Sequence, residues 1–132
     1  MKIIKREIVI EAPVEKVWEH ITVPEKIAGW LMRTDFAPVV GKDFSLNCEH
    51  QGAIPCTVKE IVPHQKLAYS FKLKSPPIET LVTITLLKEG KNTRLTLVHS
   101  GWDALPPSEQ GAADQYGSGW GGFLEKLKSQ LQ

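Results

Sequence analysis

The last third of the chain limits its fold more than any other feature. Strand-like patterns fill the residues from Asp43 to Ser100, and one long helical stretch then closes the chain. At about 1.5 Å per residue this helix reaches roughly 35 Å, enough to cross a whole sheet. A single long helix laid on one curved antiparallel sheet tends to enclose a hollow, and this α+β arrangement is the fold that we predict. The helix presents its apolar residues on one stripe: Ala113, Tyr116, Trp120, Leu124, Leu127 and Leu131.

The rest of the chain supplies the strands of that sheet. Apolar and polar residues alternate in seven segments, which indicates half-buried strands. Two short helices, Val14–Ile21 and Pro24–Gly29, separate the first strand from the others. The final helix is predicted to begin at Pro106, and the whole chain, 1–132, is expected to form a single domain. The predicted strands are Ile3–Glu11, Phe36–Gly41, Asp43–Cys48, Ile54–Val62, Leu67–Lys74, Glu79–Lys88 and Thr93–Ser100, with a hairpin turn at Glu89-Gly90-Lys91-Asn92.

Composition excludes several classes of function. The 132 residues carry a formal net charge of +1 and no block of like charges. A nucleic-acid surface needs clustered Lys and Arg, and so does a polybasic membrane contact, so we expect neither. No apolar run approaches the roughly 20 residues that span a bilayer, and the N-terminus is charged where a signal peptide is apolar. We therefore predict a cytoplasmic protein without membrane insertion and without a cofactor.

The two cysteines allow more than one interpretation. If Gln51-Gly52-Ala53 forms the turn, the numbers of facing residues sum to 104, and Cys48 faces Cys56. Facing Cβ atoms lie about 4.5–5.5 Å apart, so a disulfide is sterically conceivable. The two thiols and His50 also hint at a metal, but structural zinc normally takes four ligands. Buried, reduced thiols are the simpler interpretation, and we predict no metal site.

Aromatic residues from distant segments are predicted to converge under the final helix. Ligand pockets are mostly apolar and carry a few polar groups, which fits this set, whereas a filled aromatic core is the alternative. We expect the following residues to line the cavity: Trp30, Phe36, Phe44, Leu46, Cys48, Cys56, Tyr69, Phe71, Leu97, His99, Trp102, Tyr116, Trp120, Phe123 and Leu124.

Among the polar residues of this set, His99 is the one best suited to take part in chemistry. It ends a strand beside Gly101-Trp102 and could transfer protons or anchor a ligand, since histidine titrates near neutral pH. The alternative is a hydrogen-bonded histidine that orders the turn. We assign no catalytic residue, because no nucleophile stands in a recognisable motif. An enzyme would have to draw on His99, His50, Tyr69 and Glu60.

Five segments, in the same order along the chain, resemble one known family. They are Ile8–Trp18, Val23–Trp30, Glu60–Leu67, Thr93–Trp102 and Gly119–Leu124. The first resembles the entry signature of the SRPBCC (START-related, helix-grip) superfamily. The others are similar to its branch of activators of heat-shock-protein-90 ATPase. The resemblance implies a seven-stranded antiparallel sheet that grips the C-terminal helix around a cavity.

The resemblance implies a fold and several possible activities. Members of the superfamily include lipid carriers, cyclases and hydrolases, and co-chaperones. Our first hypothesis is a carrier or sensor that binds a small hydrophobic molecule, such as a lipid or polyphenol. The alternatives are a cyclase or hydrolase acting on a hydrophobic substrate, and a co-chaperone-like module of the stress response with a chaperone partner.

Overall fold

The computed structural model describes residues 3–48, 52–74, 77–106, 108 and 111–131. Three helices, seven strands and one 3₁₀ turn make up the described chain. In chain order they are β1 (Ile4–Ile10), α1 (Val14–Thr22), α2 (Pro24–Trp30), β2 (Arg33–Thr34), β3 (Asp43–Cys48), β4 (Gly52–Val62), β5 (Lys66–Lys74), β6 (Pro77–Glu89), β7 (Asn92–Ser100), η1 (Trp102–Ala104) and α3 (Gly111–Leu131).

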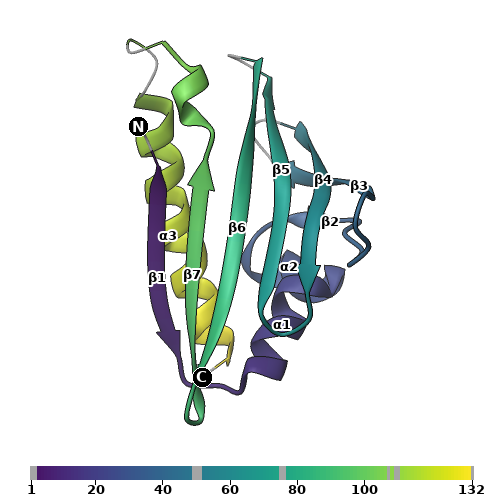
Figure 1. Ribbon diagram of the computed structural model, residues 1–132, viewed down its shortest axis with the longest axis vertical. Coiled ribbons are helices and arrows are strands. Elements are labelled where there is room, and N and C mark those ends of the chain that lie inside the picture. Colours follow the sequence, from purple (N-terminus) through teal and green to yellow (C-terminus); the bar gives the residue numbers. More distant parts are fainter. Residues whose placement is uncertain (1–2, 49–51, 75–76, 107, 109–110, 132) are drawn as a thin grey trace.

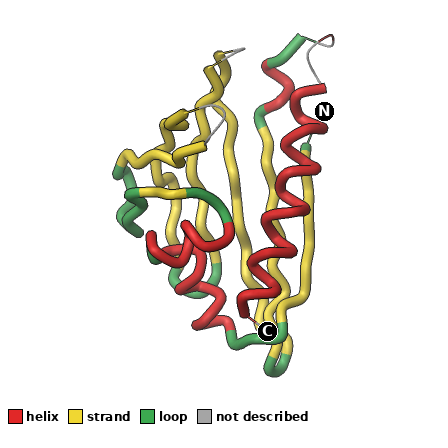
Figure 2. Tube along the Cα trace, turned by 180° about the vertical axis from the view of Figure 1, so that it is seen from behind, coloured by secondary structure: helices red, strands yellow, loops and turns green. Residues whose placement is uncertain are grey.

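The seven strands form one curved antiparallel sheet in the order β1-β7-β6-β5-β4-β3-β2. Consecutive strands are neighbours except at one edge, where β1 pairs with β7 and Ile4 lies opposite His99. All three helices cover the same face: α3 lies behind β1 and β7, and α1 and α2 lie toward the opposite edge (Figures 1 and 2). The predicted α+β helix-grip fold is confirmed. No helix within the described ranges is long and apolar enough to cross a membrane.

Alternation along the strands decides which face the helices cover. On β7, every second residue from Thr93 to His99 is buried, and the residues between them are partly exposed. The neighbouring strand β6 buries Val82, Ile84 and Leu86 on the same side. A period of two places alternate side chains on opposite faces, so these rows form the inner wall of the sheet. The core lies between this wall and the helices.

The predicted strand Phe36–Gly41 is wrong. The structure has a short strand β2 just before it, and residues 35–42 form an irregular segment. Pro38 cannot donate to a strand ladder, and the start of the segment finds other hydrogen bonds. Asp35 Oδ1 accepts from the Ser45 N–H at 2.8 Å, and Thr34 Oγ1 accepts from the Phe36 N–H at 3.1 Å. Phe36 is thereby turned into the core, 4% exposed.

The predicted register of the β3–β4 hairpin is also wrong. Phe44, not Cys48, lies opposite Cys56, and Cys48 lies opposite Gly52, so facing residue numbers sum to 100. The two cysteines are therefore four positions apart along the ladder, about 13 Å, and do not face each other. An even-numbered slip keeps each side chain on its face, so alternation could not separate the two registers. The turn, with His50, lies outside the described residues.

The final helix begins at Gly111 and not at Pro106. Because Pro106 precedes a second proline, its own backbone is biased away from the helical region. The unpredicted turn η1 lies just before Pro106 and follows Gly101, whose φ is +98°. A Cβ at Gly101 would lie 3.1 Å from Thr80 Cα, so this position needs glycine for both conformation and space. The close approach sets Trp102 against the inner face of the sheet.

Replacing Gly101 is expected to be costly. The Gly101→Ala variant should lose about 2–3 kcal/mol of unfolding free energy, because a positive φ is strained for alanine and the β6 backbone is close. Gly90→Ala is the matched control, because Gly90 has a φ of +64° but a Cβ at this position would meet nothing within 4 Å. Urea unfolding measures both variants. Equal losses would show that the contact with Thr80 contributes nothing.

Candidate ligand-binding site

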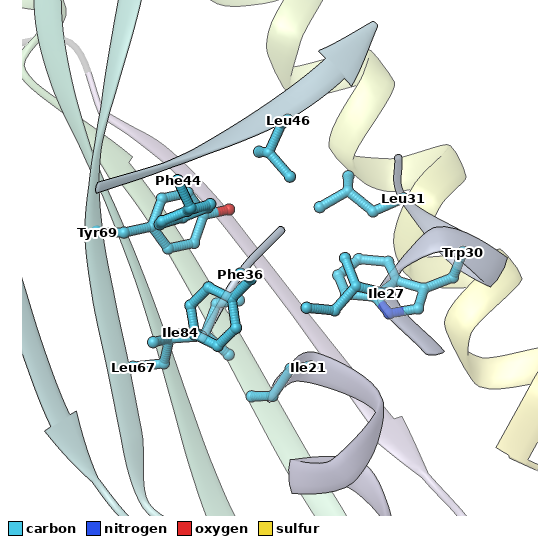
Figure 3. Close-up of a pocket in the computed structure, with 10 residues that line it drawn as sticks. All are labelled: Ile21, Ile27, Trp30, Leu31, Phe36, Phe44, Leu46, Leu67, Tyr69 and Ile84. Carbon is cyan, nitrogen blue, oxygen red and sulfur yellow. The ribbon is translucent and has the colours of Figure 1, made fainter. Parts of the chain in front are cut away.

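A small apolar cavity lies between the inner face of the sheet and the short helices (Figure 3). Its open space is about 20 Å³, which holds roughly one water molecule. The helices α1 and α2, the segment that follows them, and strands β3, β5 and β6 all contribute to the wall. The lining residues are Ile21, Ile27, Trp30, Leu31, Phe36, Phe44, Leu46, Leu67, Tyr69 and Ile84.

Aromatic side chains close one side of this cavity. Phe36 meets Phe44 edge-on with ring centroids 5.0 Å apart, and Phe44 meets Tyr69 at 5.4 Å. Edge-to-face contacts at these distances are favourable for aromatic rings. On the opposite wall, Trp30 is fixed because its indole N–H donates to the carbonyl of His20 at 2.7 Å. Contacts of this kind are present on both sides of the cavity, and the polar atom of Trp30 is satisfied.

The cavity gathers part of the predicted set and adds residues that the sequence analysis missed. Trp30, Phe36, Phe44, Leu46 and Tyr69 belong to the set expected from the sequence and line this cavity. The missed residues are apolar positions on the strands of the sheet or on and directly after the short helices: Ile21, Ile27, Leu31, Leu67 and Ile84. None of the ten described lining residues comes from α3; they come from the short helices, the segment after them and the sheet.

A second cluster of predicted residues surrounds His99, which is fully buried. Its ring lies 4.7 Å from the ring of Trp102, 5.3 Å from Phe71 and 6.1 Å from Trp120. The four side chains come from β5, β7, η1 and α3. Together they join the C-terminal helix and the turn before it to the middle of the sheet.

A chain of hydrogen bonds fixes the proton on the His99 ring. An indole N–H can only donate, and Trp120 Nε1 lies 3.0 Å from His99 Nδ1, so Nδ1 is the bare nitrogen. The other nitrogen, Nε2, then carries the proton and donates to Thr80 Oγ1 at 2.7 Å. Thr80 in turn donates to the main-chain carbonyl of Phe71 at 2.8 Å. In this series of hydrogen bonds, every donor therefore faces an acceptor.

This environment keeps His99 neutral. Burial disfavours the charged imidazolium and lowers the pKa of His99 to about 3. A protonated ring would also direct an N–H from Nδ1 at the indole N–H of Trp120. A histidine in this state does not exchange protons near neutral pH, so its contacts favour a structural role in ordering the strand end over proton transfer.

The hydroxyl of Thr80 is expected to carry measurable stability. In Thr80→Val, the His99 N–H and the Phe71 carbonyl each lose the hydrogen bond to this hydroxyl in a buried site, which should cost about 2 kcal/mol. Thr80→Ser keeps the hydroxyl and should lose clearly less. Chemical denaturation of both variants against the wild type measures the difference. A loss in Thr80→Val no larger than the loss in Thr80→Ser would contradict this expectation, because the hydroxyl would then contribute no more than the methyl group.

Comparison with known proteins identifies the family. The model of the family described as activator of Hsp90 ATPase homolog 1-like protein matches residues 11–132. The chain belongs to this family. The match begins just after β1 and includes both the small cavity and the His99 cluster. No curated protein matches the chain.

Solved structures of the same fold cover nearly the whole chain of this family member. Protein MLL2253 from Mesorhizobium loti is 31% identical, with a TM-score of 0.90 over 98% of this chain and 96% of its own. Bacillus halodurans protein BH1534 is 28% identical, with a TM-score of 0.85 over 100% and 98% of the two chains. The Aha1 dimer from Colwellia psychrerythraea is 21% identical, with a TM-score of 0.83 over 99% and 96% of the chains, and shares the fold.

The remaining predicted residues of this family member lie in the core or outside what the structure describes. Leu97, Leu124 and Cys56 are buried, and Phe123 is partly buried against the core. Burial and the nearby Asp35 raise the pKa of Cys56 to about 12, so its thiol stays protonated. The side chains of Cys48 and Tyr116 lie outside the described part. Among the described residues, no three His, Cys, Asp or Glu side chains come together as metal ligands.

Glu60, which the enzyme hypothesis names, is not among the described residues that line the cavity. Its carboxylate pairs with Lys66 at 3.0 Å, and about half of its side chain is exposed. Of the candidate polar groups within the described residues, Tyr69 alone lines the cavity, because His99 belongs to the second cluster and Glu60 pairs with Lys66. His50 lies outside the described residues.

Proposed function

We propose that this protein binds a small hydrophobic molecule, as a carrier or sensor, in the cavity between the sheet and the short helices. The observation that carries the proposal is the wall itself: its ten described side chains are apolar except for the hydroxyl of Tyr69 and the satisfied indole N–H of Trp30. Pockets for small molecules are typically apolar with a few placed polar groups. Membership of a family with a hydrophobic ligand-binding fold supports the same interpretation.

The cavity has to enlarge before such a molecule fits. Ligand sites usually measure about 300–1,000 Å³, whereas this one holds about 20 Å³. Phe36 is the lining side chain whose departure would enlarge the cavity most simply. It enters from the irregular segment 35–42 and contacts Phe44 edge-on. In our proposal, Phe36 acts as a plug that swings outward when the ligand enters.

The segment that carries Phe36 is suited to such a movement. From Ala37 to Lys42 every residue is exposed or partly exposed, so Phe36 is the segment's one buried side chain. Its ends are held by hydrogen bonds: Asp35 accepts from the Ser45 N–H, and the Gly41 N–H donates to the Val58 carbonyl at 2.8 Å. Because the residues from Ala37 to Lys42 bury little surface, the free-energy cost of opening the segment comes mainly from exposing the Phe36 ring.

The direct test is to ask whether the protein carries or takes up an apolar molecule. Native mass spectrometry of freshly purified protein, followed by extraction, identifies any molecule that has been retained. An NMR titration of the ¹⁵N-labelled protein with a fatty acid and a flavonoid-like compound then shows where binding occurs. We expect saturable shifts at Phe36, Phe44 and the other cavity residues. A protein without retained molecules and without saturable shifts would exclude the proposal.

A further inference from the structure

Tyr69 places one polar atom inside the apolar cavity. It lies in the middle of β5, opposite Val58 on β4 and Val82 on β6, with its side chain on the inner face of the sheet. The residue is 4% exposed and lines the cavity. In Figure 3 its oxygen points past Phe44 into the space between the sheet and the short helices.

The other polar side-chain groups around this region have partners within the protein. The Trp30 indole donates to His20, the Thr22 hydroxyl donates to the carbonyl of Trp18, and the Thr34 hydroxyl donates to the carbonyl of Ser45, each at 2.7 Å. For Tyr69 Oη, no hydrogen-bond partner exists among the described residues. Buried tyrosine hydroxyls normally find one, because leaving such a group unsatisfied costs stability. A hydrogen-bond partner for Tyr69 Oη can reach it through the adjoining cavity.

The surroundings of Tyr69 define the chemistry of that partner. Burial raises the pKa of Tyr69 well above its usual value, so the phenol stays neutral and can donate its proton in a hydrogen bond. None of the ten described lining residues carries a charge. A carboxylate or phosphate group would therefore be buried without a counter-charge, which is strongly unfavourable. A neutral oxygen acceptor on an apolar body meets both conditions.

We propose that Tyr69 Oη is the polar anchor of the cavity and that the ligand is a neutral molecule with a carbonyl-type oxygen at one end. The inference rests on the proposed function and narrows it to ketones, esters and related neutral compounds. The hydroxyl donates to the ligand oxygen, while the aromatic and aliphatic walls hold the apolar remainder.

A pair of probes of nearly equal shape tests the anchor. Acetophenone carries a carbonyl oxygen where α-methylstyrene carries a CH₂ group. Their dissociation constants are measured by NMR titration for the wild type and for Tyr69→Phe. We expect the preference for acetophenone over α-methylstyrene to fall about 5-fold in the variant, as one net hydrogen bond predicts. The α-methylstyrene affinity should be unchanged, which makes this probe the internal control.

The outcomes separate the anchor from the proposed function. If both probes bind and their ratio is the same in wild type and variant, the anchor is wrong and the hydrophobic site stands. If neither probe binds the wild type at millimolar concentration, the proposed function fails, and the anchor fails with it. Thermal unfolding without ligand gives a second measurement. Tyr69→Phe should melt at or above the wild-type temperature, and a fall of more than about 4 °C would show that the hydroxyl serves the fold.

Discussion

Acidification from pH 6.5 to pH 4 is expected to remove about 3 kcal/mol from the free energy of unfolding through His99 alone. The folded protein holds this ring neutral, with a pKa of about 3, whereas the unfolded chain binds a proton near the ordinary value of 6.5. Between these two values the unfolded state binds more protons than the folded state. Stability therefore rises with pH across the window and falls as the pH is lowered, by up to about 1.4 kcal/mol per unit.

Urea unfolding at half-unit steps from pH 7.5 to pH 4 measures this slope. His99→Gln is the control, because glutamine has no titratable ring. This variant should be less stable at pH 7, since the contacts with Trp120 and Thr80 are disturbed, but its stability should depend less steeply on pH. The groups that face His99 in the described structure, Phe71, Thr80, Trp102 and Trp120, do not titrate in this range. A wild-type slope no steeper than that of the variant would contradict the assignment.

Removing the plug is expected to convert the closed cavity into an open one. Phe36→Ala should cost about 3 kcal/mol of unfolding free energy, because a buried aromatic ring leaves a void behind. An apolar void of about 150 Å³ is enough to bind benzene in an engineered protein. We therefore expect millimolar benzene to raise the melting temperature of Phe36→Ala by several degrees and that of the wild type by much less.

The matched variant Phe36→Leu distinguishes the effect of the opened cavity volume from the effect of a loss in unfolding free energy. Leucine keeps most of the apolar side chain, so this change should cost about 1 kcal/mol and open little space. Benzene should then raise its melting temperature hardly more than that of the wild type. If benzene acts equally on the alanine and leucine variants, or on neither, the space behind Phe36 does not open into a binding cavity, and the plug hypothesis is wrong.

The sequence allowed the strands and the sheet to be predicted because burial repeats along them. Alternation from Thr93 to His99 marks an inner face, and the structure has that face. The same signal could not fix the pairing of Cys56 with Phe44, because a slip of an even number of residues keeps every side chain on its side. Choosing between such registers requires the position of the turn.

The cavity was harder to predict than the sheet. Pro38 prevents a regular strand around Phe36, so alternation could not predict where this side chain lies. Its place in the wall depends on hydrogen bonds made by Thr34 and Asp35 across to Ser45. The lining residues of α1 and α2 are ordinary apolar positions, and only their meeting with Phe44 and Tyr69 makes them a wall. Contacts between segments far apart in the chain leave no local pattern in the sequence.

The pairing of β1 with β7 has a consequence for synthesis of the chain. Ile4 and His99 lie opposite each other although 95 positions separate them, so the first strand is made long before its partner. At about 5–20 residues per second, β1 waits roughly 5–20 s on the ribosome with the apolar face of Ile4, Ile8 and Ile10 unpaired. During that interval the nascent chain exposes an unpaired edge, and the polar residues Lys5, Arg6 and Glu7 within the strand are suited to limit aggregation until the sheet closes.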